Sequence, residues 1–423
     1  MIKLQLHWQI LIAIASAIIV GALLDTDSRW LGIHFYDVFA FVGSMFLNAL
    51  KMIIVPLVLA SIICGVANMG SAENLGRLSG KTLLFYMISS LLAILVGLLL
   101  VNIFSPGIID GEPAGDRLNL SPASELDSKL ELVSGRDGSD IAEVFLRMVP
   151  PNIVAAAAEG QMLGLICFGL LFGFFMLKLK PSLQEAQLHF WQAVFEVMMS
   201  ITMFIMRFAP IGVFALVAKT ITATGFAAFK PLFIFFVTVV LALAAHVLIT
   251  MPLILKCVAG VNPIKQYRAM APAILTAFST ASSAGTLPVT MECVEKNMGV
   301  SNKTTSFVLP LGATVNMDGT ALYECVAAMF IAQAYGLELG LATQFTIVLI
   351  ALLTSIGVAG IPAASLVAIT VILAAIGLPA EGIGMLLVTD RILDMLRTSV
   401  NVFSDSCCAT VIARSEGESL NNS

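Results

Sequence analysis

The chain has 423 residues, of which 59% are hydrophobic and only 12% charged, and its formal net charge is −5. Soluble domains carry about 25% charged residues, so this composition excludes an ordinary soluble domain and predicts a multi-spanning membrane protein. The negative net charge also excludes the basic footprint of a nucleic-acid-binding protein.

Apolar stretches long enough to cross a hydrocarbon core of about 30 Å follow one another along the chain. They begin near residues 9, 38, 82, 153, 190, 229, 304, 341 and 383. We expect the first to be a retained helix rather than a cleaved signal peptide, because its apolar run is long and no convincing cleavage site follows it. The seven cysteines are scattered among apolar segments, which indicates neither a disulfide framework nor a metal site.

Basic residues gather in the short connections, whereas the segment from Gly107 to Asp140 is long and acidic. Cytoplasmic loops of membrane proteins carry an excess of Lys and Arg. The pattern therefore predicts a plasma (inner) membrane protein with both termini in the cytoplasm and a mobile acidic loop outside.

Two apolar segments of the C-terminal half contain small and polar residues at their centre, at 279–288 and 355–365. Each segment is about 35 residues long overall, which suits two half-length helices joined by a tip at membrane depth. Either segment alone could be a helix kinked by Ser and Gly. Two of them in corresponding positions predict re-entrant hairpins, over about 264–298 and 342–378, in a transporter built from inverted repeats.

Between these segments lies the sequence Gly312 to Thr320, in which Asn316 and Asp318 are flanked by glycines. A buried carboxylate needs a partner and Gly loosens a helix, so we expect the helix to be unwound here. Freed carbonyls and a carboxylate would form an oxygen cage for a cation such as sodium. The simpler alternative is that Asp318 caps a helix start.

A polar stripe marks the last apolar helix. Asp390, Asp394, Arg397, Asn401 and Asp405 are spaced by four, three, four and four residues, which places them within about 80° of one helix face. Charges near the bilayer centre are costly, so such a stripe turns inward and usually marks a substrate or ion path.

These motifs together resemble the dicarboxylate/amino acid:cation symporter family, which includes the excitatory amino acid transporters and the archaeal aspartate transporters. The matching motifs are Asn316 to Thr320, Gly285 to Pro288, Gly360 to Pro362 and Asp394 to Asp405. The resemblance covers essentially the whole chain. It implies a homotrimer of all-α protomers, each with eight transmembrane helices and two re-entrant hairpins arranged as inverted repeats.

The resemblance also implies a division into two domains. A scaffold would hold residues 1–80 (spans 1 and 2) and 141–218 (spans 4 and 5). A transport domain would hold residues 81–106 (span 3) and 219–423 (span 6, the first hairpin, span 7, the second hairpin and span 8), with 107–140 as the extracellular loop. The transport domain would slide as an elevator, and the second hairpin would be the gate.

By the same resemblance, Arg397 would bind the side-chain carboxylate of the substrate and Asp394 its α-ammonium group. A dicarboxylate without nitrogen would leave Asp394 buried and unpaired, so aspartate or glutamate is expected rather than malate or succinate. The other substrate contacts that it implies are Ser282, Ser283, Thr320, Ile361, Ser365, Thr398 and Asn401.

Three sodium sites are implied by the resemblance. The first would use Gly312, Asn316, Asn401 and Asp405; the second Thr314, Ser355, Ile356 and Val358; and the third Tyr86, Ser89, Ser90, Asn316 and Asp318. Sodium ions would be the coupling ions, with no other cofactor. Buried carboxylates can also titrate, so a proton-coupled symporter of the same family, for glutamate and aspartate or for a C4-dicarboxylate, remains the alternative.

The chain departs from the family in the arginines near the substrate, and also by Ser365 where a Gly is usual and Val358 where a Thr is usual. Members usually carry a second arginine near the substrate, at positions occupied here by Ala281 and Met395. Arg391 stands nearby instead, and we expect it to pair with Asp390 or with an acceptor in a hairpin. The alternative is an arginine that snorkels to the edge of the membrane.

Two rival functions fit less well, so no enzyme is expected. An intramembrane aspartyl protease would also bury acids, but Asp318 lacks the Gly-x-Gly-Asp context of that class. An anion channel needs weak multi-site binding and usually a ring of like charges. The mixed charges of the stripe suit capture of a zwitterion better.

Overall fold

Helices make up most of the chain in this computed structural model. It describes residues 6–30, 32–69, 76–118, 120, 146, 148–159, 161–337, 339–357, 364–378 and 382–421. The helices of the first half are α1 (Leu6–Leu23), α2 (Phe35–Met69), α3 (Gly76–Phe104), α6 (Ile153–Ala158), α7 (Met162–Met176), α8 (Pro181–Met206) and α9 (Ala209–Thr224). Those of the second half are α10 (Phe229–Ala245), α11 (Met251–Ile254), α12 (Pro263–Thr280), α13 (Ser283–Glu292), α14 (Asn302–Val315), α15 (Asp318–Ala334), α16 (Leu341–Gly357), α17 (Ala364–Ala375) and α18 (Ile383–Ser415).

The sequence predicted an all-α protein, but the structure also contains four short strands among its described residues. Two short antiparallel pairs join helices: β1 (Arg29–Trp30) with β2 (Ile33–His34), and β3 (Ile108–Ile109) with β4 (Glu112–Pro113). Asp110 and Gly111, which form the second turn, both have positive φ angles, of 57° and 86°. An Asp-Gly turn of this kind matches the twist of two paired strands, which explains the hairpin.

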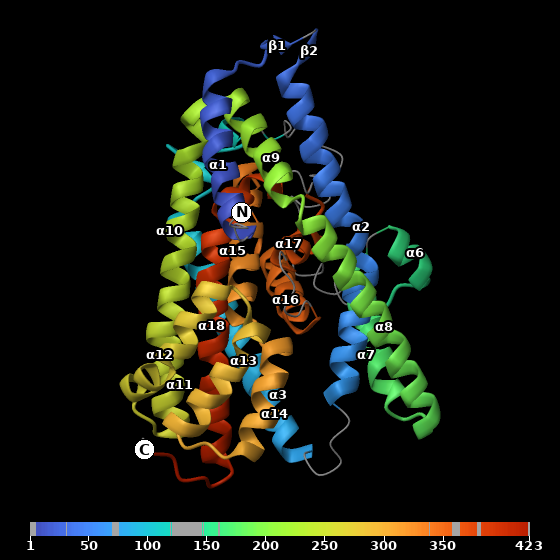
Figure 1. The fold of residues 1–423 in the computed structure, drawn as a ribbon, viewed down its shortest axis with the longest axis vertical. Helices are drawn as coiled ribbons and strands as arrows, with labels where there is room; N and C mark the ends of the chain where they lie inside the picture. Colours follow the sequence, from blue (N-terminus) through green and yellow to red (C-terminus); the bar gives the residue numbers. More distant parts are fainter. Residues whose placement is uncertain are drawn as a thin grey trace, which may run out of the picture.

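The helices form two packed groups. Helix α2 contacts α7, α8 and α9, and α1 contacts α9, whereas α18 contacts α10, α12, α14 and α15, and α3 contacts α10 and α15. Figure 1 shows α2, α7 and α8 together on the right and α10, α12 and α18 together on the left. Glycine permits the close approach within the first group, because a Cβ atom on Gly212 would collide with the ring of Phe46.

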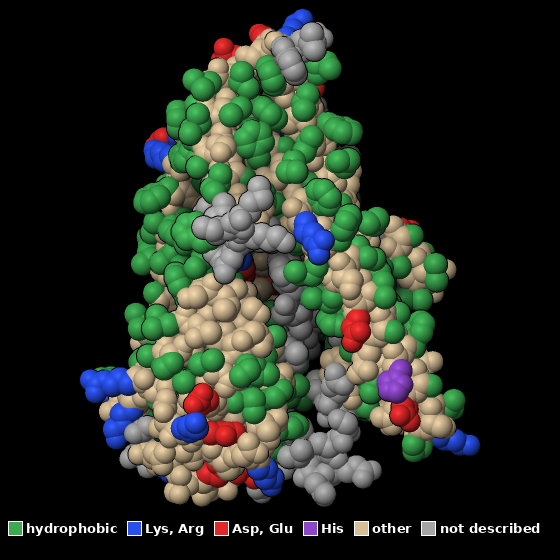
Figure 2. Space-filling view, viewed as in Figure 1, with side chains coloured by type: hydrophobic (Ala, Val, Ile, Leu, Met, Phe, Trp, Pro, Cys, Tyr) green, Lys and Arg blue, Asp and Glu red, His purple; other side chains and the backbone are tan. Residues whose placement is uncertain are grey.

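Much of the surface is apolar. Figure 2 shows hydrophobic side chains over much of one face, with charged side chains gathered mainly near its lower end and at its top. Within the described residues, three helical stretches are long and apolar enough to cross a membrane: Gly80–Phe104, Pro181–Met206 and Ala209–Ala259. The second begins at Pro181 rather than near residue 190, because Pro at the first helical turn starts a helix whose early residues are polar.

The two interrupted segments each contain two helices. Between α12 and α13, Ala281 adopts a left-handed conformation, with φ 49°, and Ser282 caps α13 by accepting a bond from the Gly285 amide. In the second segment α16 ends at Gly357 and α17 begins at Ala364. The tip between α16 and α17, which includes Val358 and Ile361, lies outside the described residues. Most of the acidic loop lies outside them as well.

The predicted break between residues 312 and 320 is confirmed, and it is short. Helix α14 ends at Val315, Asn316 and Met317 leave the helical conformation, and α15 begins at Asp318. The φ and ψ angles of Asn316 are −100° and 105°, those of extended backbone. The break turns the side chains of Asn316 and Asp318 toward α18.

Candidate functional site

The stripe on α18 faces the protein interior around Arg397, whose side chain is only 1% exposed. Its Nη2 atom donates to Oδ1 of Asp390 at 3.0 Å and to Oδ1 of Asp394 at 3.1 Å. Its Nη1 atom donates to the hydroxyl of Ser365 at 3.0 Å, and the guanidinium lies 3.9 Å from the centre of the Tyr323 ring. Two carboxylates and an aromatic face therefore compensate the burial of this charge.

The guanidinium of Arg397 still has a free donor. Its Nε atom is buried and has no hydrogen-bond partner among the described residues. A buried donor without an acceptor costs free energy. A carboxylate brought to this guanidinium would supply an acceptor and could bind in a bidentate manner.

Arg391 does not pair as predicted. Its Nη1 atom lies 3.3 Å from Oδ2 of Asp394, one helical turn further along, and within the described part of the chain it forms no ion pair with Asp390 or a hairpin residue. Asp394 rather than Asp390 is the partner because residues three apart on a helix are neighbours, so the long side chain follows the helix to that carboxylate. The tip of the second hairpin lies outside the described residues. Asp394 therefore lies between two guanidinium groups.

Asn401 ties α18 to the start of α15. Its Oδ1 atom accepts from the amide of Gly319 at 2.8 Å, and its Nδ2 atom donates to the hydroxyl of Thr320 at 3.2 Å. A Cβ atom on Gly319 would lie 2.8 Å from the carbonyl oxygen of Arg397, so only glycine allows the two backbones to approach this closely. The structure thus brings Thr320, Arg397 and Asn401 together.

Of the remaining predicted substrate residues, Thr398 lies on α18 and the others lie at the breaks between α12 and α13 and between α16 and α17. Ser283 is buried at the start of α13, whereas the Ser282 hydroxyl is engaged as the cap of that helix. Thr398 donates its hydroxyl to the Asp394 carbonyl of its own helix, at 2.8 Å. Ser365 contacts Arg397 directly, as given above. Ile361 lies outside the described residues.

A second polar cluster surrounds Asp318, which is fully buried. Ser90 and Ser89, both predicted for the third sodium site, donate to its Oδ1 atom at 2.6 and 3.2 Å. Ser404 donates to Oδ2 at 2.5 Å, and the His246 Nε2 atom lies 3.3 Å from the same oxygen. The sequence reasoning missed both of these partners.

The sequence contains only weak signals that Ser404 and His246 contact Asp318. Ser404 directly precedes Asp405 on the stripe helix, and His246 stands alone in an apolar span. A single polar residue in a span is a pointer to an internal partner, but the pattern does not say which one.

Asp405 forms a third group with Asn316, whose Nδ2 atom donates to it at 2.9 Å. The Oδ1 atom of Asn316 is buried without a partner among the described residues. A Cβ atom on Gly312 would collide with the Asp405 carboxylate and lie 2.5 Å from the Tyr86 hydroxyl, so glycine leaves room there. Carboxylate, amide and hydroxyl oxygens are the ligands that a hard cation prefers, so these residues fit sodium.

The second predicted cation site is only partly described. Thr314 lies in the last turn of α14, and Ser355 and Ile356 lie in the last turn of α16, where carbonyl groups lack helical partners. Val358 lies outside the described residues.

One buried acid near the site was not predicted. Glu324 on α15 is completely buried, and its Oε2 atom accepts from the Thr354 hydroxyl at 2.9 Å. Its Oε1 atom has no hydrogen-bond partner among the described residues. An isolated charge would be costly in such a place, so this group is suited to carrying a proton.

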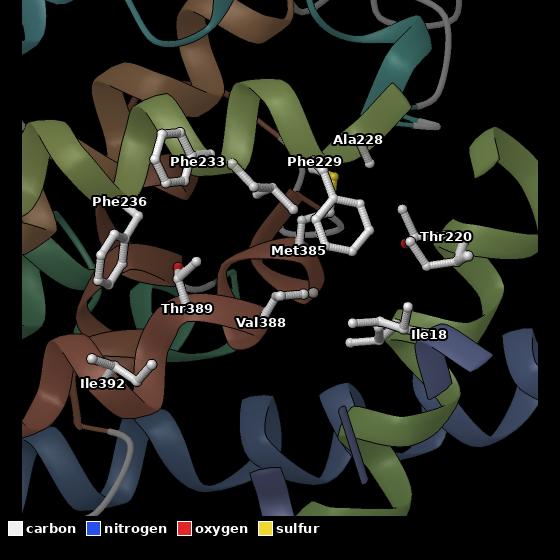
Figure 3. A pocket seen from close by; sticks show the side chains of 14 residues that line it. Ile18, Thr220, Ala228, Phe229, Phe233, Phe236, Met385, Val388, Thr389 and Ile392 are labelled. Carbon is white, nitrogen blue, oxygen red and sulfur yellow. The ribbon is translucent and has the colours of Figure 1, made fainter. Parts of the chain in front are cut away.

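A cavity of about 260 Å³ lies away from the polar stripe, between α1, α9, α10 and α18. Figure 3 shows that apolar side chains such as Phe229, Phe233 and Met385 line it. Its two threonines, Thr220 and Thr389, donate their hydroxyls to carbonyls of their own helices. The cavity therefore offers nothing to bind a charged solute.

A helical membrane protein with a buried, mixed-charge site on its last helix, beside a broken helix rich in oxygen ligands, has the features of a secondary transporter. The comparisons with known proteins agree. The chain matches the sodium:dicarboxylate symporter family over residues 6–415, and it belongs to that family.

Relatives match over nearly the full length. The chain is 35% identical to the proton/sodium-glutamate symport protein of Geobacillus stearothermophilus, over 98% of this chain and 96% of that protein. It is 36% identical to the proton/glutamate-aspartate symporter of Escherichia coli, over 98% and 94% respectively. It is 34% identical to human excitatory amino acid transporter 3, over 95% and 84%. Its family members are transporters rather than enzymes.

Proposed function

We propose that this protein couples the inward movement of sodium to the uptake of an acidic amino acid, L-aspartate or L-glutamate. The observation that carries the proposal is the buried Arg397, whose Nε donor beside Asp394 has no acceptor among the described residues. The guanidinium suits a second carboxylate, and Asp394 suits an ammonium group. The printed names of the relatives, which are glutamate and aspartate symporters, support this choice.

In this proposal, Thr320, Thr398, Asn401 and Ser365 complete the polar wall of the substrate site. Ser282, Ser283 and the backbone near Ile361 close over the α-carboxylate from the two helix breaks. Burial of this wall excludes water, so each polar contact discriminates more strongly than it would in solvent.

Sodium ions would occupy the groups around Asp405 and Asp318 and the ends of α14 and α16. Oxygen atoms such as Oδ1 of Asn316, which is buried and has no hydrogen-bond partner in the described part of the chain, support a cation there. We further propose a homotrimer in the plasma membrane with cytoplasmic termini. In each protomer of eight spans and two re-entrant hairpins, the group of α3, α10 and α12–α18 would slide against the group of α1, α2 and α6–α9.

Proton coupling is the second candidate. Glu324 is completely buried, and no basic residue is among its hydrogen-bond partners in the described part of the chain. Such a carboxyl can carry a proton across the membrane with the substrate. The relatives include symporters named for protons as well as for sodium.

Uptake of labelled L-aspartate into proteoliposomes tests the proposal. We expect accumulation when sodium is outside, and none when choline replaces it at equal pH. Accumulation that ignores sodium and follows an imposed pH gradient would favour proton coupling, and Glu324→Gln would then abolish it. No accumulation of either acidic amino acid under any gradient would contradict both candidates.

A further inference from the structure

Asp394 is shared between two guanidinium groups in this protein. Arg397 holds its Oδ1 atom at 3.1 Å, and Arg391 holds its Oδ2 atom at 3.3 Å. Each carboxylate oxygen therefore has a charged donor of its own. The side chains of Asp394 and Arg391 are 26% and 21% exposed, so both charges are largely withdrawn from water.

Charge balance gives Arg391 its importance. Asp390, Asp394, Arg391 and Arg397 form a cluster of two acids and two bases with a net charge of zero. Without Arg391, the single guanidinium of Arg397 would face two carboxylates. Asp394 would then depend on the ammonium group of the substrate for its second positive neighbour.

Arg391 approaches Asp394 from its own side. Asp390, Arg391 and Asp394 line a small cavity of about 60 Å³, together with apolar residues of α1, α2, α8 and α9 and with Leu366 of α17 and Leu387 of α18. Arg397 instead lies against Tyr323 on α15 and Ser365 on α17. Arg391 can therefore keep its contact with Asp394 while Arg397 binds a carboxylate.

We infer that Arg391 is a specificity-determining residue that acts through Asp394. By neutralising Asp394 it removes much of the penalty for a substrate that lacks an α-ammonium group. The protein then discriminates only weakly between aspartate and a four-carbon dicarboxylate of the same shape. This inference rests on the proposed function and reverses the expectation that Asp394 alone rejects such substrates.

Competition between two ligands tests the role of Arg391. Unlabelled succinate, which is aspartate without its amino group, and unlabelled L-aspartate are each titrated against uptake of labelled L-aspartate. The ratio of the inhibition constant of succinate to that of aspartate is then measured. We expect Arg391→Gln to raise this ratio in favour of aspartate by about tenfold to a hundredfold, as loss of a charge-assisted bond predicts. A ratio measured on one preparation does not depend on how much protein is folded.

Two variants serve as controls. Arg391→Lys keeps the charge and is expected to hold the ratio within about threefold of the wild type, because an ammonium also neutralises the carboxylate. Arg414→Gln removes a positive charge from the same helix, where Arg414 donates to the Ala259 carbonyl far from Asp394, and should leave the ratio unchanged.

The outcomes separate the inference from the proposed function. An unchanged ratio in Arg391→Gln, or an equal change in Arg414→Gln, overturns the role of Arg391 while uptake of aspartate stands. If the wild type takes up neither L-aspartate nor L-glutamate, the proposed function itself fails. If the wild type takes up aspartate and succinate does not compete at all, Asp394 is not neutralised by Arg391 and the inference also fails.

Discussion

At the scale of single residues, the charges of the stripe explain why a cation should accompany the substrate. The charges of Asp394 and its three charged neighbours, Asp390, Arg391 and Arg397, sum to zero. An acidic amino acid carries a net charge of −1 at neutral pH. Adding that charge to a buried site is costly unless a positive charge enters as well. The oxygen-rich groups around Asp318 on α15 and Asp405 on α18 could hold this positive charge.

Arg397→Cys should lose acidic substrates. Removing the guanidinium deletes a bidentate partner for the substrate carboxylate, so affinity for L-aspartate should fall by about a hundredfold or more. Binding to purified protein, measured by calorimetry, checks this, and Arg397→Lys should give an intermediate loss. Arg414→Cys is the control on the same helix. Unchanged aspartate affinity in Arg397→Cys would show that this guanidinium does not bind substrate.

At the scale of elements, the sequence predicted the helix breaks, because the residues at these places disfavour a continuous helix. Asn316 and Asp318 between glycines are poor residues for an apolar helix, and the helix is indeed broken between Val315 and Asp318. The small-residue run around Ala281 likewise coincides with the turn between α12 and α13. In both places the residues themselves disfavour a continuous helix.

Features set by tertiary packing could not be predicted in this way. The partner of Arg391 depends on which carboxylate oxygen is free, and the position of His246 beside Asp318 joins residues that are 72 apart in the chain. The two-residue strands are too short to show an alternating pattern. Helical spacing gives the face of a side chain but not the neighbour across the interface.

The C-terminal segment after α18 is fastened to α14 through Glu418. Its carboxylate accepts from the Ser301 amide at 2.8 Å, the Ser301 hydroxyl at 2.7 Å and the Thr304 hydroxyl at 2.6 Å. Burial alone would raise the pKa of Glu418, but these hydrogen bonds outweigh it and hold the pKa below its ordinary value of 4.5. The carboxylate also favours the positive N-terminal end of α14.

Glu418→Gln should destabilise the protein in a pH-dependent way. Because the pKa is lower in the folded state, the contribution of Glu418 is complete above its ordinary pKa and disappears as the pH falls through the folded value. We expect a loss of about 1 kcal/mol at pH 7, after allowance for partial exposure, and no difference once both proteins are neutral at this position. Thermal unfolding in detergent from pH 7 down to about pH 3 checks this. A difference that stays constant over that range would contradict it.

At the scale of the whole molecule, the two packed groups of helices share a boundary. Helix α9 touches α18, and α2 touches α16 and α17. The apolar cavity between α1, α9, α10 and α18 opens at this boundary, so the groups are not tightly packed against each other there. A boundary that is loosely filled and apolar at this cavity is suited to sliding there.

A cross-link between α9 and α18 should stop transport if the groups slide. A Cβ atom on Gly384 would lie 3.8 Å from the Cβ of Leu216, which is about the separation that a disulfide requires. We expect the double variant Leu216→Cys, Gly384→Cys to lose uptake on mild oxidation, to keep aspartate binding and to recover on reduction. The single variants, which contain the same seven native cysteines, should be unaffected by oxidation. Full cross-linking with undiminished uptake would show that α9 and α18 do not move past each other, and the elevator would have to be abandoned while the substrate site on α18 stood.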